Sequence, residues 1–202
     1  LLYRYGYFTQ HLSAMGDQIS TYEPQDFMKI PATPVRDAAN NWVTITIAFP
    51  GRNLNARVWR VDVGRTELYL LDTDFEDNWP EDRQITYQLY GGDWENRLKQ
   101  EFLLGVGGIR ALRALGKDAE VYHCNEGHAA FIGLERLYEY ISQDNLSFPE
   151  AMEVVRSSSL FTTHTPVPAG HDAFTEDMLR AYMSHYPAKL KIDWKTFMEL
   201  GK

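Results

Sequence analysis

The sequence predicts an α/β fold in which a Rossmann-like, doubly wound sheet is joined to an antiparallel β excursion. Residues 42–49 alternate apolar and polar side chains, the pattern of a half-buried strand, and 56–63 and 68–71 are expected to continue as strands. Residues 94–115 place apolar side chains at helical spacing. Two short apolar strands, at 119–123 and 160–163, alternate with helical segments, and this order is typical of a parallel sheet.

The first part of the chain, residues 1–73, is expected to be mostly β. An aromatic-rich opening and a Pro-Gly turn at 50–53 bound the strands, whereas residues 14–40 are rich in turn formers and are expected to be irregular. The chain opens on Leu1 and not on Met, so we expect a piece of a longer protein. The expected strands are 3–11, 42–49, 56–63 and 68–71.

The second part, residues 74–202, is expected to be α/β. Asp93 is the expected N-cap of the long helix at 94–115, and Gly116 is expected to end it. Ser147 is expected to cap the helix at 148–157. The other expected helices are 80–90, 127–142 and 175–185.

Composition excludes several classes of protein. A chain of 202 residues with 44% hydrophobic residues can bury a core. Its net charge of −8, without a basic cluster, argues against a nucleic-acid partner. Apolar runs are far shorter than the roughly 18 residues of a membrane helix, so no membrane partner is expected. A single cysteine, Cys124, predicts a reducing, cytoplasmic compartment.

The first candidate site is the turn Asn125-Glu126-Gly127-His128, where a buried strand is expected to end and a helix to begin. Ligands of open α/β sheets bind beyond the carboxyl ends of the strands. Asn125 can cap the new helix, and Gly127 lets the backbone approach a ligand. His128 either contacts a polar ligand, such as a sugar hydroxyl, or is a core-facing histidine at an ordinary helix start.

The second candidate site follows the next strand and contains His164 and Thr165, with His171 and Asp172 further along. Pro166 and neighbouring turn formers stiffen this loop. We expect both turns to meet at one edge of the sheet. The loop either contacts the ligand or is a structural loop whose histidines bind backbone groups.

Two further motifs have structural as well as functional interpretations. Asp93 and Asn96, after Gly91-Gly92, form either a polar gate at a carbohydrate cleft or a solvated helix start. The glycines of 105–108 lie inside a helical pattern and lack the spacing of a phosphate loop, so close packing explains them better.

A metal site is not expected. The possible ligands match no compact motif, there is no HExxH, and one cysteine cannot build a thiolate site. The residues considered are His123, Glu126, His128, His164, His171 and Asp172.

Four stretches, in order, resemble the α-glucan (glycogen/maltodextrin) phosphorylase family in its shorter bacterial and archaeal form. They are YRYGYFTQ at 3–10, NRLKQEFLLG at 96–105, HCNEGHAAF at 123–131 and FTTHTPVPAGHDAF at 161–174. The resemblance implies part of the N-terminal domain of a GT-B glycosyltransferase. It also implies transfer of terminal α-1,4-linked glucose from a glucan to inorganic phosphate, giving glucose 1-phosphate.

The same resemblance implies roles for individual residues. His128 corresponds to a histidine that hydrogen-bonds the sugar in the catalytic subsite, and Asn125, Glu126 and Gly127 share its turn. His164 and Thr165 match a histidine–threonine pair at the neighbouring strand end. Asp93 and Asn96 lie where the family has a gate loop.

The family uses pyridoxal phosphate, whose lysine is expected downstream of Lys202. This chain alone is therefore expected to hold no cofactor and to be inactive, and the enzyme is a possible homo-oligomer. Three alternatives remain open from the residues: a non-catalytic glucan-binding module, a metal-dependent hydrolase, and a nucleotide-sugar-dependent glucan synthase.

Overall fold

The computed structural model describes residues 1–164, 166 and 172–201. Two compact units make up the chain: Leu1–Thr46 with Asn53–Gln100, and Ile47–Arg52 with Glu101–Lys202. Strands in antiparallel and parallel pairs are combined with helices, which confirms the predicted α/β class.

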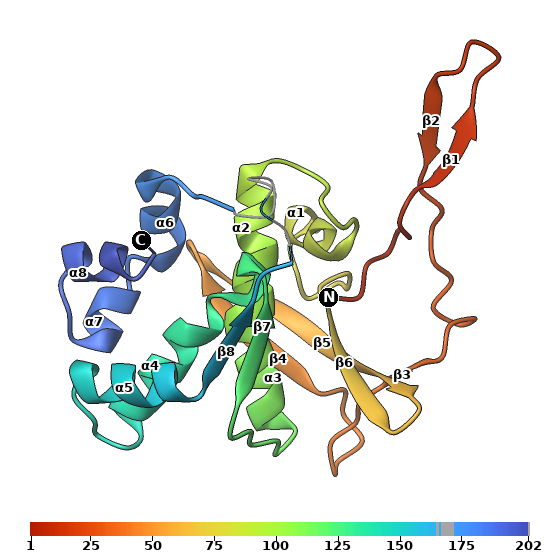
Figure 1. The fold of residues 1–202 in the computed structure, drawn as a ribbon. Helices are drawn as coiled ribbons and strands as arrows, with labels where there is room; N and C mark the ends of the chain where they lie inside the picture. Colours follow the sequence, from red (N-terminus) through yellow and green to blue (C-terminus); the bar gives the residue numbers. More distant parts are fainter. Residues whose placement is uncertain (165, 167–171, 202) are drawn as a thin grey trace. The chain divides into compact units, whose positions relative to one another are not determined.

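Strands dominate the chain up to residue 72, and short helices follow (Figure 1). The elements are β1 (Thr9–Leu12), β2 (Gln18–Thr21), β3 (Ala32–Pro34), β4 (Thr44–Phe49), β5 (Arg52–Val63), β6 (Thr66–Asp72), α1 (Pro80–Arg83), a 3₁₀ turn (Gln84–Thr86) and α2 (Trp94–Phe102).

The long strand β5 organises the antiparallel sheet, because it pairs with β3, β4 and β6. Its register with β6 runs from Arg57 opposite Asp72 to Val63 opposite Thr66. In β4, burial alternates strictly, with Ile45 buried and its threonine neighbours exposed. The predicted antiparallel excursion and its period-2 pattern are confirmed.

The opening of the chain differs from the prediction. Of the strand expected at 3–11, only Thr9–Leu12 forms, because its pairing partner is β2, which ends at Thr21. Residues 14–40 were expected to be irregular, which is wrong for β2 and β3. Gly16 closes the β1–β2 hairpin at φ +87°, a conformation that glycine adopts without steric cost.

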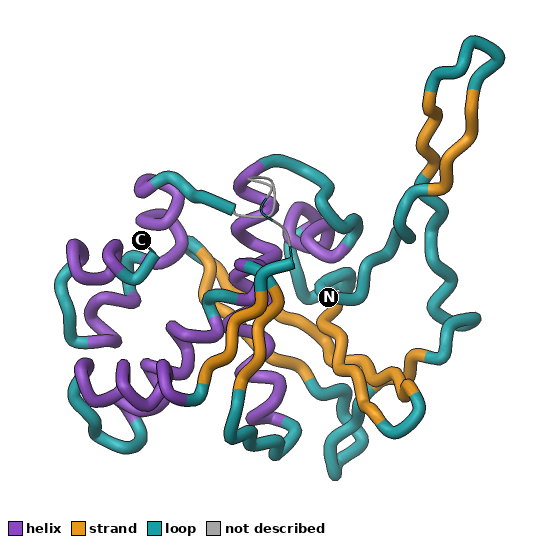
Figure 2. Tube along the Cα trace, in the orientation of Figure 1, coloured by secondary structure: helices purple, strands orange, loops and turns teal. Residues whose placement is uncertain are grey.

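The second unit is mainly helical, and Figure 2 shows helices on either side of a pair of parallel strands at 122–125 and 159–162. The elements are a π-helical turn (Leu103–Gly107), α3 (Gly108–Ala114), β7 (Tyr122–Asn125), a 3₁₀ turn (Gly127–Ala129), α4 (Ile132–Ser142), α5 (Phe148–Ser157), β8 (Ser159–Thr162), α6 (Glu176–Met183), α7 (Tyr186–Leu190) and α8 (Trp194–Glu199).

Helix boundaries were predicted well where a capping residue marks them. Ser147 forms a capping box with Glu150 at the start of α5, and Asp93 accepts from the N–H of Asn96 at the start of α2. Gly116, at φ +65°, ends α3 as expected. The helix expected at 80–90 is wrong in length, since α1 ends at Arg83 and gives way to the 3₁₀ turn.

The helical run from Trp94 to Ala114 contains a π-helical turn that the apolar spacing does not reveal. Gly105 lies in this turn, and a Cβ placed on it would lie 2.8 Å from the backbone at Phe131 and Ile132. The close-packing interpretation of the glycines is therefore confirmed at Gly105. The π-helical turn thus lies directly against the start of α4.

Replacing Gly105 by alanine is expected to lower the free energy of unfolding by about 1–3 kcal/mol, because the methyl group would overpack a backbone contact. Urea unfolding followed by circular dichroism measures the change. Gly108→Ala is the matched control, since a Cβ on Gly108 would meet nothing within 4 Å. Equal stabilities of the two variants would contradict the packing account.

Aromatic rings form much of the core of the second unit. Phe102 stacks on Phe49 with ring centroids 6.1 Å apart and meets Phe131 and Tyr186 edge-on. Such pairs add to the free energy gained from burying apolar surface. Over the described ranges, no helix is both long enough and apolar enough to span a bilayer.

Candidate functional site

The two candidate turns leave neighbouring strands at the same end. Strands β7 and β8 are parallel, and Asn125 lies opposite Thr162 at the last register position (Figure 1). Beyond it, the N–H of Glu126 donates to the carbonyl oxygen of Thr162 at 2.9 Å. The predicted meeting of both turns at one sheet edge is confirmed, with β7 beginning at Tyr122 instead of residue 119.

Glu126 connects the first turn to the second. Glu126 as a whole is 8% exposed. Its backbone angles, φ 55° and ψ −165°, lie in a region that is essentially reserved for glycine. One carboxylate oxygen accepts from the backbone N–H of His164 and lies 3.1 Å from Nδ1 of that ring. The other accepts from the Thr163 hydroxyl at 3.2 Å. These hydrogen bonds, the backbone one first, lower the pKa of Glu126.

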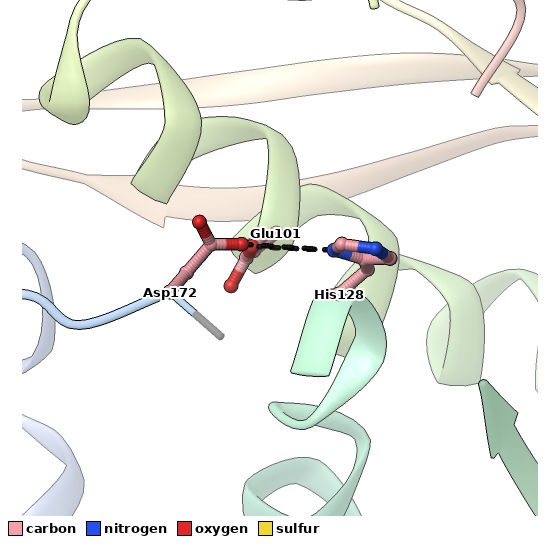
Figure 3. Close-up of side chains that lie close together, drawn as sticks. All are labelled: Glu101, His128 and Asp172. Carbon is pink, nitrogen blue, oxygen red and sulfur yellow. Dashed lines mark ion pairs between the residues drawn. The ribbon is translucent and has the colours of Figure 1, made fainter. Parts of the chain in front are cut away.

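Two carboxylates from distant parts of the chain face the same side of the His128 ring (Figure 3). Its Nδ1 is 3.6 Å from Oδ2 of Asp172 and 3.9 Å from Oε1 of Glu101. The side chain of Glu101 is 5% exposed and that of His128 is 30% exposed. Both carboxylates are largely shielded from solvent, since the side chain of Asp172 is 12% exposed.

A cavity of about 520 Å³ adjoins this cluster within the second unit. Glu101, Gly127 and Asp172 lie in its wall, and most of the remaining lining is apolar, with Phe131 and Phe174 among it. An apolar cavity with a few converging polar groups is the usual form of a small-molecule site.

The search against protein-family models found no match. Curated relatives do match along almost the whole chain. A glycogen phosphorylase from Mycobacterium tuberculosis is 47% identical over 91% of this chain and 22% of its own length. A maltodextrin phosphorylase from Thermococcus litoralis is 42% identical over 100% of this chain and 24% of its own length. A glycogen phosphorylase from Aquifex aeolicus is 33% identical over 99% of this chain and 29% of its own length.

The chain is homologous to a segment of the glycogen and maltodextrin phosphorylases. The resemblance drawn from the four motifs is confirmed. The chain spans roughly a quarter of the length of these relatives, so it corresponds to one segment of each phosphorylase.

Not all of the predicted site residues belong to the edge described above. Asp93 and Asn96 belong to the first unit, where Asn96 donates through Nδ2 to the carbonyl oxygen of Gly91 at 2.8 Å. Asn125 is exposed at the end of β7, and its expected capping role is wrong, since the 3₁₀ turn begins after Glu126. Thr165 lies outside the described residues, as does His171.

Sequence reasoning missed Glu101 as part of the site. The signal was present, because Glu101 follows Leu98 by three residues and so lies on the buried face of an amphipathic helix. A carboxylate at such a position needs a partner or a ligand. Asp172 was expected in the second candidate loop, but its place beside His128 depends on tertiary structure.

Two of the described lysines are engaged by other side chains. Lys99 pairs with Glu95 at 3.6 Å. The ammonium of Lys189 lies 4.9 Å and 5.1 Å from the ring centres of Tyr138 and Tyr186, so aromatic faces already cover it.

Glu101, His128 and Asp172 are also the side chains that could hold a metal ion, with ligand atoms within 4.8 Å of one another. The positions of these residues in the sequence match no compact metal-binding motif. We therefore expect EDTA to leave the melting temperature unchanged. Thermal unfolding with and without EDTA, together with metal analysis, tests this. Stoichiometric zinc or manganese would contradict it.

Proposed function

We propose that this chain is the part of a glucan phosphorylase that carries sugar-contacting residues of the catalytic cleft. The enzyme would transfer terminal α-1,4-linked glucose from a glucan to inorganic phosphate, giving glucose 1-phosphate. One observation carries the proposal: the chain aligns over 91–100% of its length with proteins named glycogen or maltodextrin phosphorylase. The fold assignment that goes with it is the N-terminal, Rossmann-like part of a GT-B glycosyltransferase.

In this proposal His128 is the catalytic histidine, and it hydrogen-bonds a sugar hydroxyl in the transition state. Support comes from its place just beyond the carboxyl end of β7 and from its partial exposure. Asp172 and Glu101 both lie on the Nδ1 side of the ring, at 3.6 and 3.9 Å. A charged or well-oriented donor at such a position stabilises a transition state better than a mobile one does.

His164 and Thr165 are proposed as sugar contacts at the end of β8, and Asn125 and Gly127 as contacts from the turn after β7. The side chain of His164 is 60% exposed, which suits a contact with a ligand. Asp93 and Asn96 are proposed as a short gate segment. The Gly91-Gly92 pair before them, with Gly92 at φ +81°, supplies the backbone freedom that a gate needs.

Pyridoxal phosphate is proposed as the cofactor of the complete enzyme, held by residues outside this chain. Its phosphate would act as the acid–base partner of the substrate phosphate. The part played by this chain is to bind and orient the sugar. A cytoplasmic location and assembly into a homo-oligomer belong to the same proposal.

The test is an assay of the enzyme that contains this segment, with its cofactor bound. Maltoheptaose and inorganic phosphate are expected to give glucose 1-phosphate, and omission of phosphate is expected to abolish the release of sugar. Hydrolysis to free glucose that does not depend on phosphate would overturn the proposal. Nucleotide-sugar-dependent chain growth, without phosphorolysis, would also overturn it.

A further inference from the structure

We propose that Glu126 is a positioning residue for His164 and does not itself contact the sugar. This inference rests on the proposed function for its ligand, but the contacts that carry it lie within the second unit. It changes the role expected for Glu126 from the sequence, which placed this residue among the sugar contacts.

The carboxylate of Glu126 is turned toward the second turn. Oε1 accepts from the backbone N–H of His164 and faces the Nδ1 atom of the same ring, and Oε2 accepts from the Thr163 hydroxyl. Both oxygens are thus engaged by the segment that follows β8. The side chain is 10% exposed, compared with 60% for His164. A hydroxyl of a bound sugar would therefore meet the histidine ring and not the carboxylate.

The backbone of Glu126 gives independent support. A non-glycine residue with φ 55° and ψ −165° is strained, and such strain persists only where surrounding contacts fix it. Here the N–H of Glu126 is bound to Thr162 while its carboxylate is bound to Thr163 and His164. The strained turn directs the carboxylate across from β7 to the end of β8.

Glu126 also selects which atom of His164 faces the ligand. With Nδ1 beside a carboxylate at 3.1 Å, the ring proton belongs on Nδ1, and Nε2 is the atom presented outward. In the neutral ring, Nε2 accepts a hydrogen bond, which suits a hydroxyl that donates. His123 is engaged through its other ring nitrogen, because its Nε2 lies 2.6 Å from the hydroxyl oxygen of Thr162.

The test compares Glu126→Gln, which removes the charge at constant size, with Glu126→Gly, which removes the carboxylate and relieves the backbone strain. Glu120→Gln, an exposed carboxylate ahead of β7, is the matched control. Two readouts are needed: the ¹⁵N shifts of the His164 ring in this chain, and KM and kcat for maltoheptaose in the complete enzyme. The His123 ring serves as an internal reference for an intact fold.

Glu126→Gly is expected to move the His164 ring signals toward the Nε2–H form while His123 is unchanged, and Glu126→Gln, whose amide oxygen can still accept from Nδ1, is expected to move them less. KM for the glucan is expected to rise about tenfold or more, from the loss of a hydrogen bond to a charged group, with a smaller change in kcat. Unmoved His164 signals in Glu126→Gly would overturn the inference. Because the ring signals need no turnover, they test the inference even if phosphorolysis is not observed.

Discussion

Replacing His128 by alanine in the complete enzyme is expected to lower kcat/KM for phosphorolysis by about 30- to 1000-fold, which corresponds to about 2–4 kcal/mol of lost transition-state stabilisation. His128 stands beyond the carboxyl end of β7 with Nδ1 facing Asp172 and Glu101. Its ring is therefore held before the sugar arrives. Steady-state rates of glucose 1-phosphate release measure the loss.

Two other variants test whether the effect of His128→Ala is specific to this site. His11→Ala is the matched control, because His11 is an exposed residue of the β1–β2 hairpin and its loss should leave the rate unchanged. Asp172→Asn keeps the ring but removes one of the two carboxylates, so its rate should fall less than that of His128→Ala. Unchanged kinetics for His128→Ala would remove this residue from the site.

Replacing Glu135 by alanine is expected to destabilise the chain by about 3 kcal/mol, because it breaks a buried ion pair. Arg110 binds both carboxylate oxygens of Glu135, at 2.6 and 3.2 Å, and the Tyr186 hydroxyl donates to one of them at 3.1 Å. Removal of Glu135 would leave a guanidinium and a hydroxyl without this acceptor. Partial exposure of Arg110 keeps the loss at the lower end of the range for such pairs.

Urea unfolding provides the measurement for Glu135→Ala. The matched control is Glu153→Ala, which removes an exposed pair with Arg156 on α5 and should change the free energy of unfolding by less than about 1 kcal/mol. If both variants unfold at the same urea concentration, the ion pair of Glu135 and Arg110 contributes nothing to stability.

The sequence predicted those strands and helices whose pattern or capping residue lies within the element or next to it. Period-2 alternation located β4, and capping residues located α2 and α5 because the cap side chain and the helix lie next to each other in the sequence. The strand β2 was missed because its partner β1, and not its own composition, makes it a strand. The π-helical turn was missed because its cause is contact with the backbone of a distant helix.

For the site, the sequence predicted the meeting place but not the contacts. Parallel strands must end at a common edge, so the nearness of His128 and His164 to that edge followed from strand order. The carboxylate of Glu126 reaches the end of β8 because its backbone adopts a conformation that the sequence does not predict for a glutamate. The burial of Glu101 follows from its place on the helix, but its neighbour His128 lies 27 positions further along and no local pattern pairs the two.

The most direct test of the central claim is a histidine-ring NMR titration of the complete enzyme with maltoheptaose. If the ends of β7 and β8 form one sugar site, the ring signals of His128 and His164 should shift together along one saturation curve, while those of His11 and His185 stay in place. Saturable binding that leaves both His128 and His164 unmoved would contradict the account.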